Sequence, residues 1–279
     1  MEQDEGDRRG RATPGKRPRR KAAAKRSAGS ARANAGGSDH RRGRGTERAS
    51  AEAGLRIVFE DADILVVDKP AGLLTIATEK EKVRTAYHML TDRAKESSPR
   101  GRIFIVHRLD RETSGLIVFA KSAEMKRGLQ EHWNEAVTER SYAAVVEGAV
   151  SKKRGTIRSL LAENRAHHVY ATRDPEVGKP AVTHYQVLEG NGRFTLLELS
   201  LETGRKNQIR VHMQDLGHSV AGDARYGSTV DPIRRLALHA RTLELLHPRT
   251  HEKLRFESPV PKAFRRLSRQ DRRRPPDGV

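Results

Sequence analysis

Short apolar runs separated by polar segments dominate the chain from residue 55 onward, and their lengths and β-branched content predict strands. The predicted strands are 56–60, 64–67, 103–106, 116–120, 141–148, 183–188, 194–201, 236–246 and 253–257. Asn191-Gly192 lies between two of these runs and is typical of a hairpin turn. By contrast, residues 151–180 are polar without a regular period, so we expect an irregular excursion there.

Apolar residues spaced by three or four positions predict a smaller number of helices. One runs from Thr85 to about residue 94, and a second begins at the capping residue Ser122 and reaches Trp133. We expect Trp133 to lie in the core rather than to serve as a base-stacking platform. A third helix covers 209–216, and a short one follows residue 261. Many antiparallel strands with a few outer helices and a cleft across the sheet define an α+β fold.

A polar loop, His107–Gly115, separates the apolar runs 103–106 and 116–120. If both runs are buried strands, the loop must emerge from the interior and present its side chains on a rigid scaffold. It holds Asp110 between Arg108 and Arg111, and two nearby cations favour the ionised carboxylate. An ionised Asp110 suits a nucleophile or a base. The alternative is that Asp110 only tethers its loop by accepting hydrogen bonds from backbone N–H groups.

Charge and composition divide the chain into a folded part and two tails. Residues 1–54 carry 15 basic and 7 acidic side chains, a net charge of +8, and no apolar period, so we expect a disordered basic tail. Residues 55–265 form the predicted folded domain, and 266–279 form a second basic tail. The total charge of +19 suits a polyanionic partner, and the first tail is either an RNA-binding arm or a solubilising segment.

Several classes of function are excluded by what the sequence lacks. The 279 residues contain no cysteine, which excludes disulfides, zinc–thiolate sites and thiol nucleophiles and fits a reducing compartment. The twelve histidines form no HExxH motif or clustered set, so we expect no metal. No apolar run approaches ~18 residues, so we expect no membrane partner, and we predict a cytoplasmic protein.

The order of residues in the central loop points to one family. His-Arg-Leu-Asp, two residues, then Thr-Ser-Gly-Leu resembles the central signature of pseudouridine synthases of the RluA type. That resemblance identifies Asp110 as the catalytic residue and Arg108 as a residue that helps to hold the extruded nucleotide. It covers about residues 55–265, and because residues 1–54 have no folded pattern we expect no S4-like RNA-binding module there.

Three further motifs extend the resemblance. Lys69-Pro70-Ala71-Gly72-Leu73 resembles the family's first motif, which implies that Lys69 supports substrate binding near the site. Tyr142 opens an Ala-rich strand as in the second motif, where the tyrosine stacks on the target uracil. Residues 203–212 resemble the third motif, whose final arginine, here Arg210, forms an ion pair with the catalytic aspartate. The chain departs from the pattern at Asn207, where many relatives have histidine.

The implied function is isomerisation of uridine to pseudouridine in structured RNA, with ribosomal RNA as the expected target and transfer RNA as the alternative. The reaction needs no cofactor, and we expect a monomer. Asp110 adds to the sugar C1′, adds to the base C6, or removes a sugar proton; the glycosidic bond then breaks, the uracil rotates, and C5 bonds to the ribose. The rival hypothesis is a noncatalytic RNA-binding or ribosome-assembly protein that keeps the fold. The presence of Asp110, Tyr142 and Arg210 argues against that rival.

Overall fold

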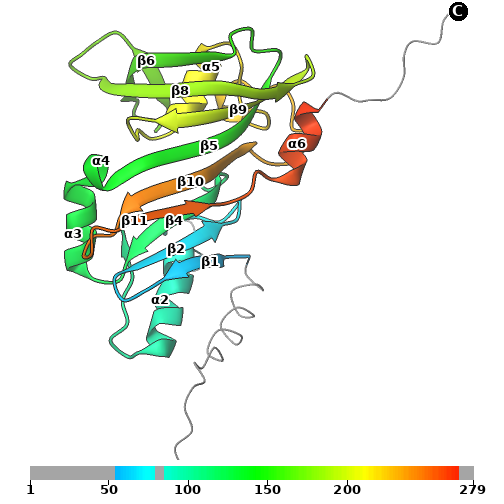
Figure 1. Ribbon diagram of the computed structural model, residues 1–279. Helices are drawn as coiled ribbons and strands as arrows, with labels where there is room; N and C mark the ends of the chain where they lie inside the picture. The colour runs from blue at the N-terminus through cyan, green and yellow to red at the C-terminus, as the bar shows by residue number, and fades with distance from the viewer. Residues whose placement is uncertain (1–53, 79–84, 270–279) are drawn as a thin grey trace, which may run out of the picture. The chain divides into compact units, whose positions relative to one another are not determined.

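The computed structural model describes residues 54–78 and 85–269, and across them eleven strands form one mixed sheet (Figure 1). Nine strands follow the order β1-β2-β4-β10-β5-β9-β8-β6-β7, while β3 pairs with β4 and β11 with β10. The strands are β1 Arg56–Glu60, β2 Ile64–Lys69, β3 Phe104–Ile105, β4 Ser114–Ala120, β5 Val137–Glu147, β6 Arg154–Glu163, β7 Val169–Thr172, β8 Lys179–Gly190, β9 Phe194–Leu201, β10 Leu238–Leu246 and β11 Lys253–Glu257.

Five α-helices and one 3-10 helix accompany the sheet in the described residues. They are α2 Ala86–Ser97, α3 Ala123–Glu131, α4 Trp133–Ala136, α5 Gln208–Asp215, η1 Ala224–Tyr226 and α6 Lys262–Ser268. No helix among these is long and apolar enough to cross a membrane. The mixture confirms the predicted α+β class, and the hairpin at Asn191-Gly192 joins β8 to β9 as expected.

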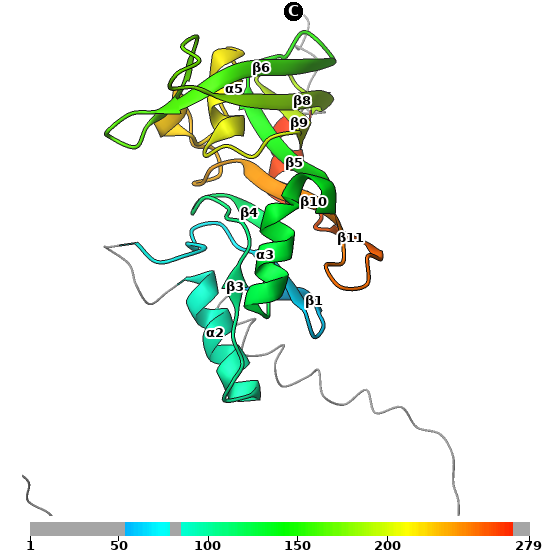
Figure 2. The ribbon, with the colours of Figure 1, turned by 90° about the vertical axis from the view of Figure 1, so that its left-hand side faces the viewer.

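The strand β4 is buried at all seven positions because helices cover both of its faces. Ile117 and Phe119 pack in one cluster with Ala86 and Leu90 of α2. The alternate residues of β4 pack in another cluster with Met125 and Leu129 of α3, so α2 and α3 lie on opposite faces of β4 (Figure 2). This explains why β4 is an unbroken apolar run, as strands covered on both faces usually are.

Several predicted boundaries shift. Ser114 and Gly115 belong to β4, so the central loop ends at Thr113, and the predicted strand 103–106 is reduced to two residues. Ser122 caps α3 as predicted, accepting a hydrogen bond from the backbone N–H of Met125, but the helix ends before Trp133. The helix α6 continues to the fully buried Ser268, three residues beyond the predicted domain end at 265. The predicted tail 1–54 lies outside the described residues except for Gly54.

The prediction of an irregular excursion at 151–180 is wrong, because these residues form β6, β7 and the start of β8. The inward positions of β6 are residues 155, 157, 159 and 161, and two of them are Gly155 and Ser159. Small and polar residues at inward positions hide the apolar alternation on which the prediction relied.

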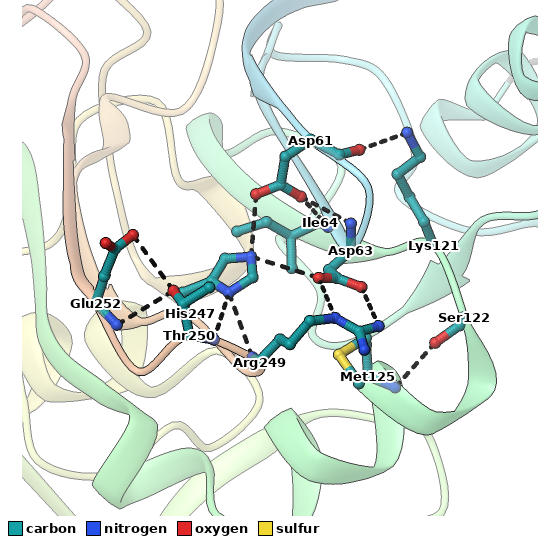
Figure 3. A network of polar contacts seen from close by, with 10 residues as sticks. All are labelled: Asp61, Asp63, Ile64, Lys121, Ser122, Met125, His247, Arg249, Thr250 and Glu252. Carbon is teal, nitrogen blue, oxygen red and sulfur yellow. Dashed lines mark hydrogen bonds and ion pairs between the residues drawn. The ribbon is translucent and has the colours of Figure 1, made fainter.

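A network of polar contacts joins the β1–β2 turn to the β10–β11 turn (Figure 3). Arg249 donates from Nε and Nη2 to the carboxylate of Asp63, at 2.7 and 2.6 Å. Asp61 contacts the Nε2 atom of His247 at 3.0 Å and accepts from the backbone N–H groups of Asp63 and Ile64. Two turns separated by 186 residues are thereby held together at one end of the sheet.

Arg249→Gln is expected to destabilise the fold modestly at neutral pH, since it removes a bidentate partner of Asp63 but Arg249 is itself 59% exposed. Hydrogen bonds from Arg249 lower the pKa of Asp63 from its ordinary value of 3.8. A lowered pKa contributes stability above 3.8, and that stability disappears as pH falls through the lowered value. Urea unfolding should therefore show a gap between wild type and variant at pH 6 that narrows toward pH 3. A constant gap would contradict the ionic contribution.

Candidate active site

The loop that carries Asp110 is held by backbone contacts on both sides of this residue. The hydroxyl of Thr75 donates to the carbonyl of Leu109 at 2.9 Å and accepts from the N–H of Leu109 at 3.3 Å. On the other side, the carbonyl of Arg111 accepts from the N–H of Gly72 at 2.9 Å. The segment 69–75 therefore fixes the backbone around Asp110, whose carboxylate stays 34% exposed.

Lys69 also contacts this loop. It is fully buried, and its Nζ atom donates to the backbone carbonyls of Pro70, Leu73 and Arg111 at 3.0, 2.7 and 3.1 Å. Burial lowers the pKa of Lys69 to about 7, and the charge of Glu112 opposes that shift. Lys69 is not among the described residues that line the cavity. These contacts tie Lys69 to the backbone around Asp110, and its role in substrate binding stays a prediction.

The C-terminal end of the loop is fixed where β4 meets β10, the parallel pair at the centre of the sheet. Gly115 has φ of +112°, and a Cβ atom here would lie 2.1 Å from the carbonyl oxygen of Ala240. The neighbouring Ser114 contacts the Nδ1 atom of the buried His239 at 2.8 Å, and Arg235 donates to Ser114 at 2.8 Å. The strand β4, which follows the central loop, is thus paired with β10 at its first two residues.

Asp110 and Arg210 face each other, 100 residues apart in the chain, with Nη1 of Arg210 at 3.4 Å from Oδ2 of Asp110. The shorter contacts of Arg210 are to Asp223, which accepts from Nε and Nη2, both at 2.7 Å. Asp223 is almost completely buried. Burial opposes the charge of Arg210, but the hydrogen bonds and charge of Asp223 outweigh it and raise the pKa of Arg210. Asp223 therefore anchors Arg210, which in turn faces Asp110.

Tyr226 and Asn207 also contact the guanidinium of Arg210. Its Cζ atom lies 4.7 Å from the ring centroid of the buried Tyr226. Asn207 accepts from Nη1 of Arg210 at 3.2 Å and donates to the hydroxyl of Tyr226 at 2.9 Å. Asn207 has φ of +53°, a left-handed conformation that asparagine tolerates better than most residues. The departure from histidine at position 207 leaves the pair of Asp110 and Arg210 in place.

Tyr142 and Arg108 complete the predicted set. Tyr142 is half-buried on β5, next to Ala240 of β10 in the sheet. Burial raises the pKa of Tyr142, so it remains a neutral phenol, which suits stacking rather than ionic contact. Arg108 is exposed. The pKa of His107 is lowered to about 3 by burial, so its imidazole is neutral, and Nε2 accepts from the N–H of Val118.

One cavity of about 780 Å³ brings these groups together. It is lined by Arg108, Asp110, Tyr142 and Arg210, so four of the five predicted site residues share it. Sequence reasoning missed Asp223 and Tyr226, which lie next to Gly222 and Gly227 in the chain. A half-buried arginine such as Arg210 needs a second, buried carboxylate as its partner. That need was the available signal for an acid near Arg210.

Asp110 is the acid among the described residues that line the cavity, and it lies beside the guanidinium that Asp223 holds. Within residues 54–78 and 85–269, no three acidic or histidine side chains are grouped to hold a metal ion. The arrangement offers a carboxylate for nucleophilic or base chemistry, an aromatic ring for stacking and an exposed arginine.

Comparison with known proteins shows that residues 63–215 match the family described as RNA pseudouridylate synthase. A Bacillus subtilis protein named an uncharacterised RNA pseudouridine synthase is 38% identical over 217 residues, 77% of this chain and 72% of that protein. The ribosomal large subunit pseudouridine synthase D of Nitrosomonas europaea is 42% identical over 218 residues, 74% of this chain. The match covers 62% of the Nitrosomonas protein, less than two thirds of its length.

A solved structure is similar as well. Human RNA pseudouridylate synthase domain containing 1 matches with a TM-score of 0.60 and 27% identity, over 74% of this chain and 84% of that one.

Proposed function

The chain belongs to the RNA pseudouridylate synthase family, and on that premise we propose that it isomerises uridines of ribosomal RNA to pseudouridine with Asp110 as catalytic residue. Membership confirms the resemblance to pseudouridine synthases that the motifs indicated. The observation that supports the assignment of Asp110 is its position: a half-exposed carboxylate in the cavity, faced by an arginine that Asp223 holds in place.

The reaction begins when the target uridine leaves its stack, which costs a few kcal/mol. Tyr142 compensates by stacking on the uracil, an interaction worth ~1–3 kcal/mol per base in single-strand binders. Arg108, exposed and lining the cavity, holds the opened RNA. Whether Asp110 attacks C1′, attacks C6 or removes a sugar proton, it acts through its carboxylate, and the Nη1 atom of Arg210 lies 3.4 Å from Oδ2 of that group.

Ribosomal RNA is the proposed substrate because relatives that share 38–42% identity over about three quarters of this chain are named for the large ribosomal subunit.

We place the protein in the cytoplasm, where that RNA is assembled. We also propose that it acts as a monomer, since residues of one chain line the cavity from β5, α5 and the central loop. The catalytic domain is proposed to span 55–269, so that it includes the whole of α6.

Mapping pseudouridines in ribosomal and transfer RNA from cells with and without the gene tests this proposal. We expect one or more ribosomal sites to disappear on deletion and to return with wild type but not with Asp110→Asn. Loss confined to transfer RNA would assign the same chemistry to the other substrate. Unchanged maps, together with no turnover by the purified protein, would favour the noncatalytic alternative.

Deleting residues 1–54 is expected to weaken RNA binding without changing the maximum rate, if the +8 tail contacts RNA. Each Lys or Arg that contacts a phosphate of single-stranded RNA contributes ~0.7 to the slope of log affinity against log salt. Titration of residues 1–279 and 55–279 at several salt concentrations should show a flatter slope for the shorter protein. Equal slopes would make the tail a passive solubiliser. A lower rate at saturating RNA would place the domain boundary before Leu55.

A further inference from the structure

Arg140 lies in the cavity but takes no part in the chemistry described above. It is half-buried on β5, two residues before Tyr142. Its Nη2 atom donates to the carbonyls of Leu201 and Glu202, both at 3.4 Å, the long end of the hydrogen-bond range. Its Cζ atom lies 5.7 Å from the ring centroid of Trp133. These weak contacts hold the guanidinium at the cavity wall.

The charge of Arg140 has no counterion in the described part of the chain. Arg210 pairs with Asp223, and Arg241 on the neighbouring strand β10 pairs with Glu198 at 2.5 Å, whereas no ion pair of Arg140 is found there. Burial lowers the pKa of Arg140, which shows that the cation loses hydration without an acid to offset the loss. A guanidinium in this situation gains most from an anion that enters the cavity.

The local sequence leaves room for this guanidinium. A Cβ atom at Gly204 would lie 2.7 Å from Nη1 of Arg140, so any other residue at 204 would displace the tip of the arginine. Trp133 contacts both Arg140 and the ring of His107, whose centroid is 4.8 Å away. The indole is therefore engaged within the protein, which favours a role in holding Arg140 over stacking on a base.

The spacing along β5 indicates which anion this is. Residues i and i+2 of a strand project from the same face, ~7 Å apart. Arg140 is thus within one nucleotide of a base stacked on Tyr142, and a guanidinium fork matches the oxygens of a phosphodiester. We propose that Arg140, seated between Trp133 and Gly204, binds the phosphodiester that flanks the flipped uridine. This assignment rests on the proposed function, because it places the uridine on Tyr142.

The test compares Arg140→Gln and Arg140→Lys with Arg193→Gln, a matched control in which another guanidinium covers an aromatic ring, Phe194, outside the cavity. Affinity for large-subunit ribosomal RNA transcribed in vitro is titrated at several salt concentrations, and turnover is measured separately. Arg140→Gln should weaken affinity about tenfold, as expected for loss of a charge-assisted contact, and flatten the salt slope by ~0.7. Arg140→Lys should keep the slope but lose part of the affinity. Arg193→Gln should match wild type.

Gly204→Ala provides an independent test, because it displaces the guanidinium of Arg140 without removing its charge. It should raise KM several-fold with little change in kcat, and it should add nothing further in the Arg140→Gln background. Equal KM and equal salt slopes for wild type and Arg140→Gln would overturn the assignment. Failure of the proposed function would give a different result. The wild-type protein would then form no pseudouridine, whereas the RNA titration measures binding and does not depend on turnover.

Discussion

Asp110→Asn is expected to lower pseudouridine formation by about a thousandfold or more, the scale seen when a residue that performs the chemistry is removed. Asparagine keeps the size of the side chain but is neither ionised nor basic at neutral pH, so each of the three roles of Asp110 is lost. Stability should change little, because the carboxylate is 34% exposed and its contact with Arg210 is long, at 3.4 Å. RNA affinity should also be largely retained.

Release of tritium from RNA labelled at C5 of uridine measures this reaction directly, since the C5 hydrogen is lost when C5 bonds to the ribose. Asp92→Asn is a suitable control, because Asp92 is a half-exposed aspartate on α2 outside the cavity. Thermal unfolding and RNA titration of both variants show whether the fold and the binding surface are intact. Activity of Asp110→Asn within tenfold of wild type would refute its assignment as the catalytic residue.

The position of Asp110 was predictable because its causes are local. Apolar runs on both sides force the loop to leave the interior, and the structure places that loop in the cavity. The proximity of Asp110 to Tyr142 and Arg210 has no such local signal, since Arg210 lies 100 residues away. That part of the site was predicted only from the resemblance to a known family.

Buried charges account for the contacts that the sequence did not predict. Lys69 next to Pro70 is typical of an exposed turn, yet three carbonyls from its own turn and from the central loop surround its ammonium group. Asp223 follows a glycine and looks like a turn residue, but the fold buries it against Arg210. A charged residue is predictable in the interior only when its partner is known, and these partners come from distant segments.

The strands at 154–172 were missed for a different reason. The strand β6 is stabilised by pairing with β7 and β8, while its own inward positions include Gly155 and Ser159. Ser159 faces the buried His212, at 3.0 Å between Oγ and Nε2, so a polar inward residue is satisfied by a polar partner on α5. Long-range pairing determines the structure here, and the local pattern does not reveal it.

Arg210→Ala is expected to reduce both stability and turnover, and the larger part of the stability loss should come from Asp223 rather than Asp110. The side chain of Asp223 is 1% exposed, and its two oxygens accept from Arg210 at 2.7 Å. Removing the partner of a buried charge costs roughly 3–5 kcal/mol. Turnover should fall as well, because Asp110 loses the guanidinium that faces it.

The double variant Arg210→Ala/Asp223→Asn separates these two effects. Without the buried charge, the free energy of unfolding should recover part of the loss seen in Arg210→Ala, whereas turnover should stay as low as in the single variant. Urea unfolding and tritium release of wild type, both single variants and the double variant provide the full cycle. Unchanged unfolding and turnover in Arg210→Ala would mean that the contacts of Arg210 contribute neither to stability nor to catalysis. Recovery of turnover in the double variant would show that Arg210 serves stability alone and does not orient Asp110.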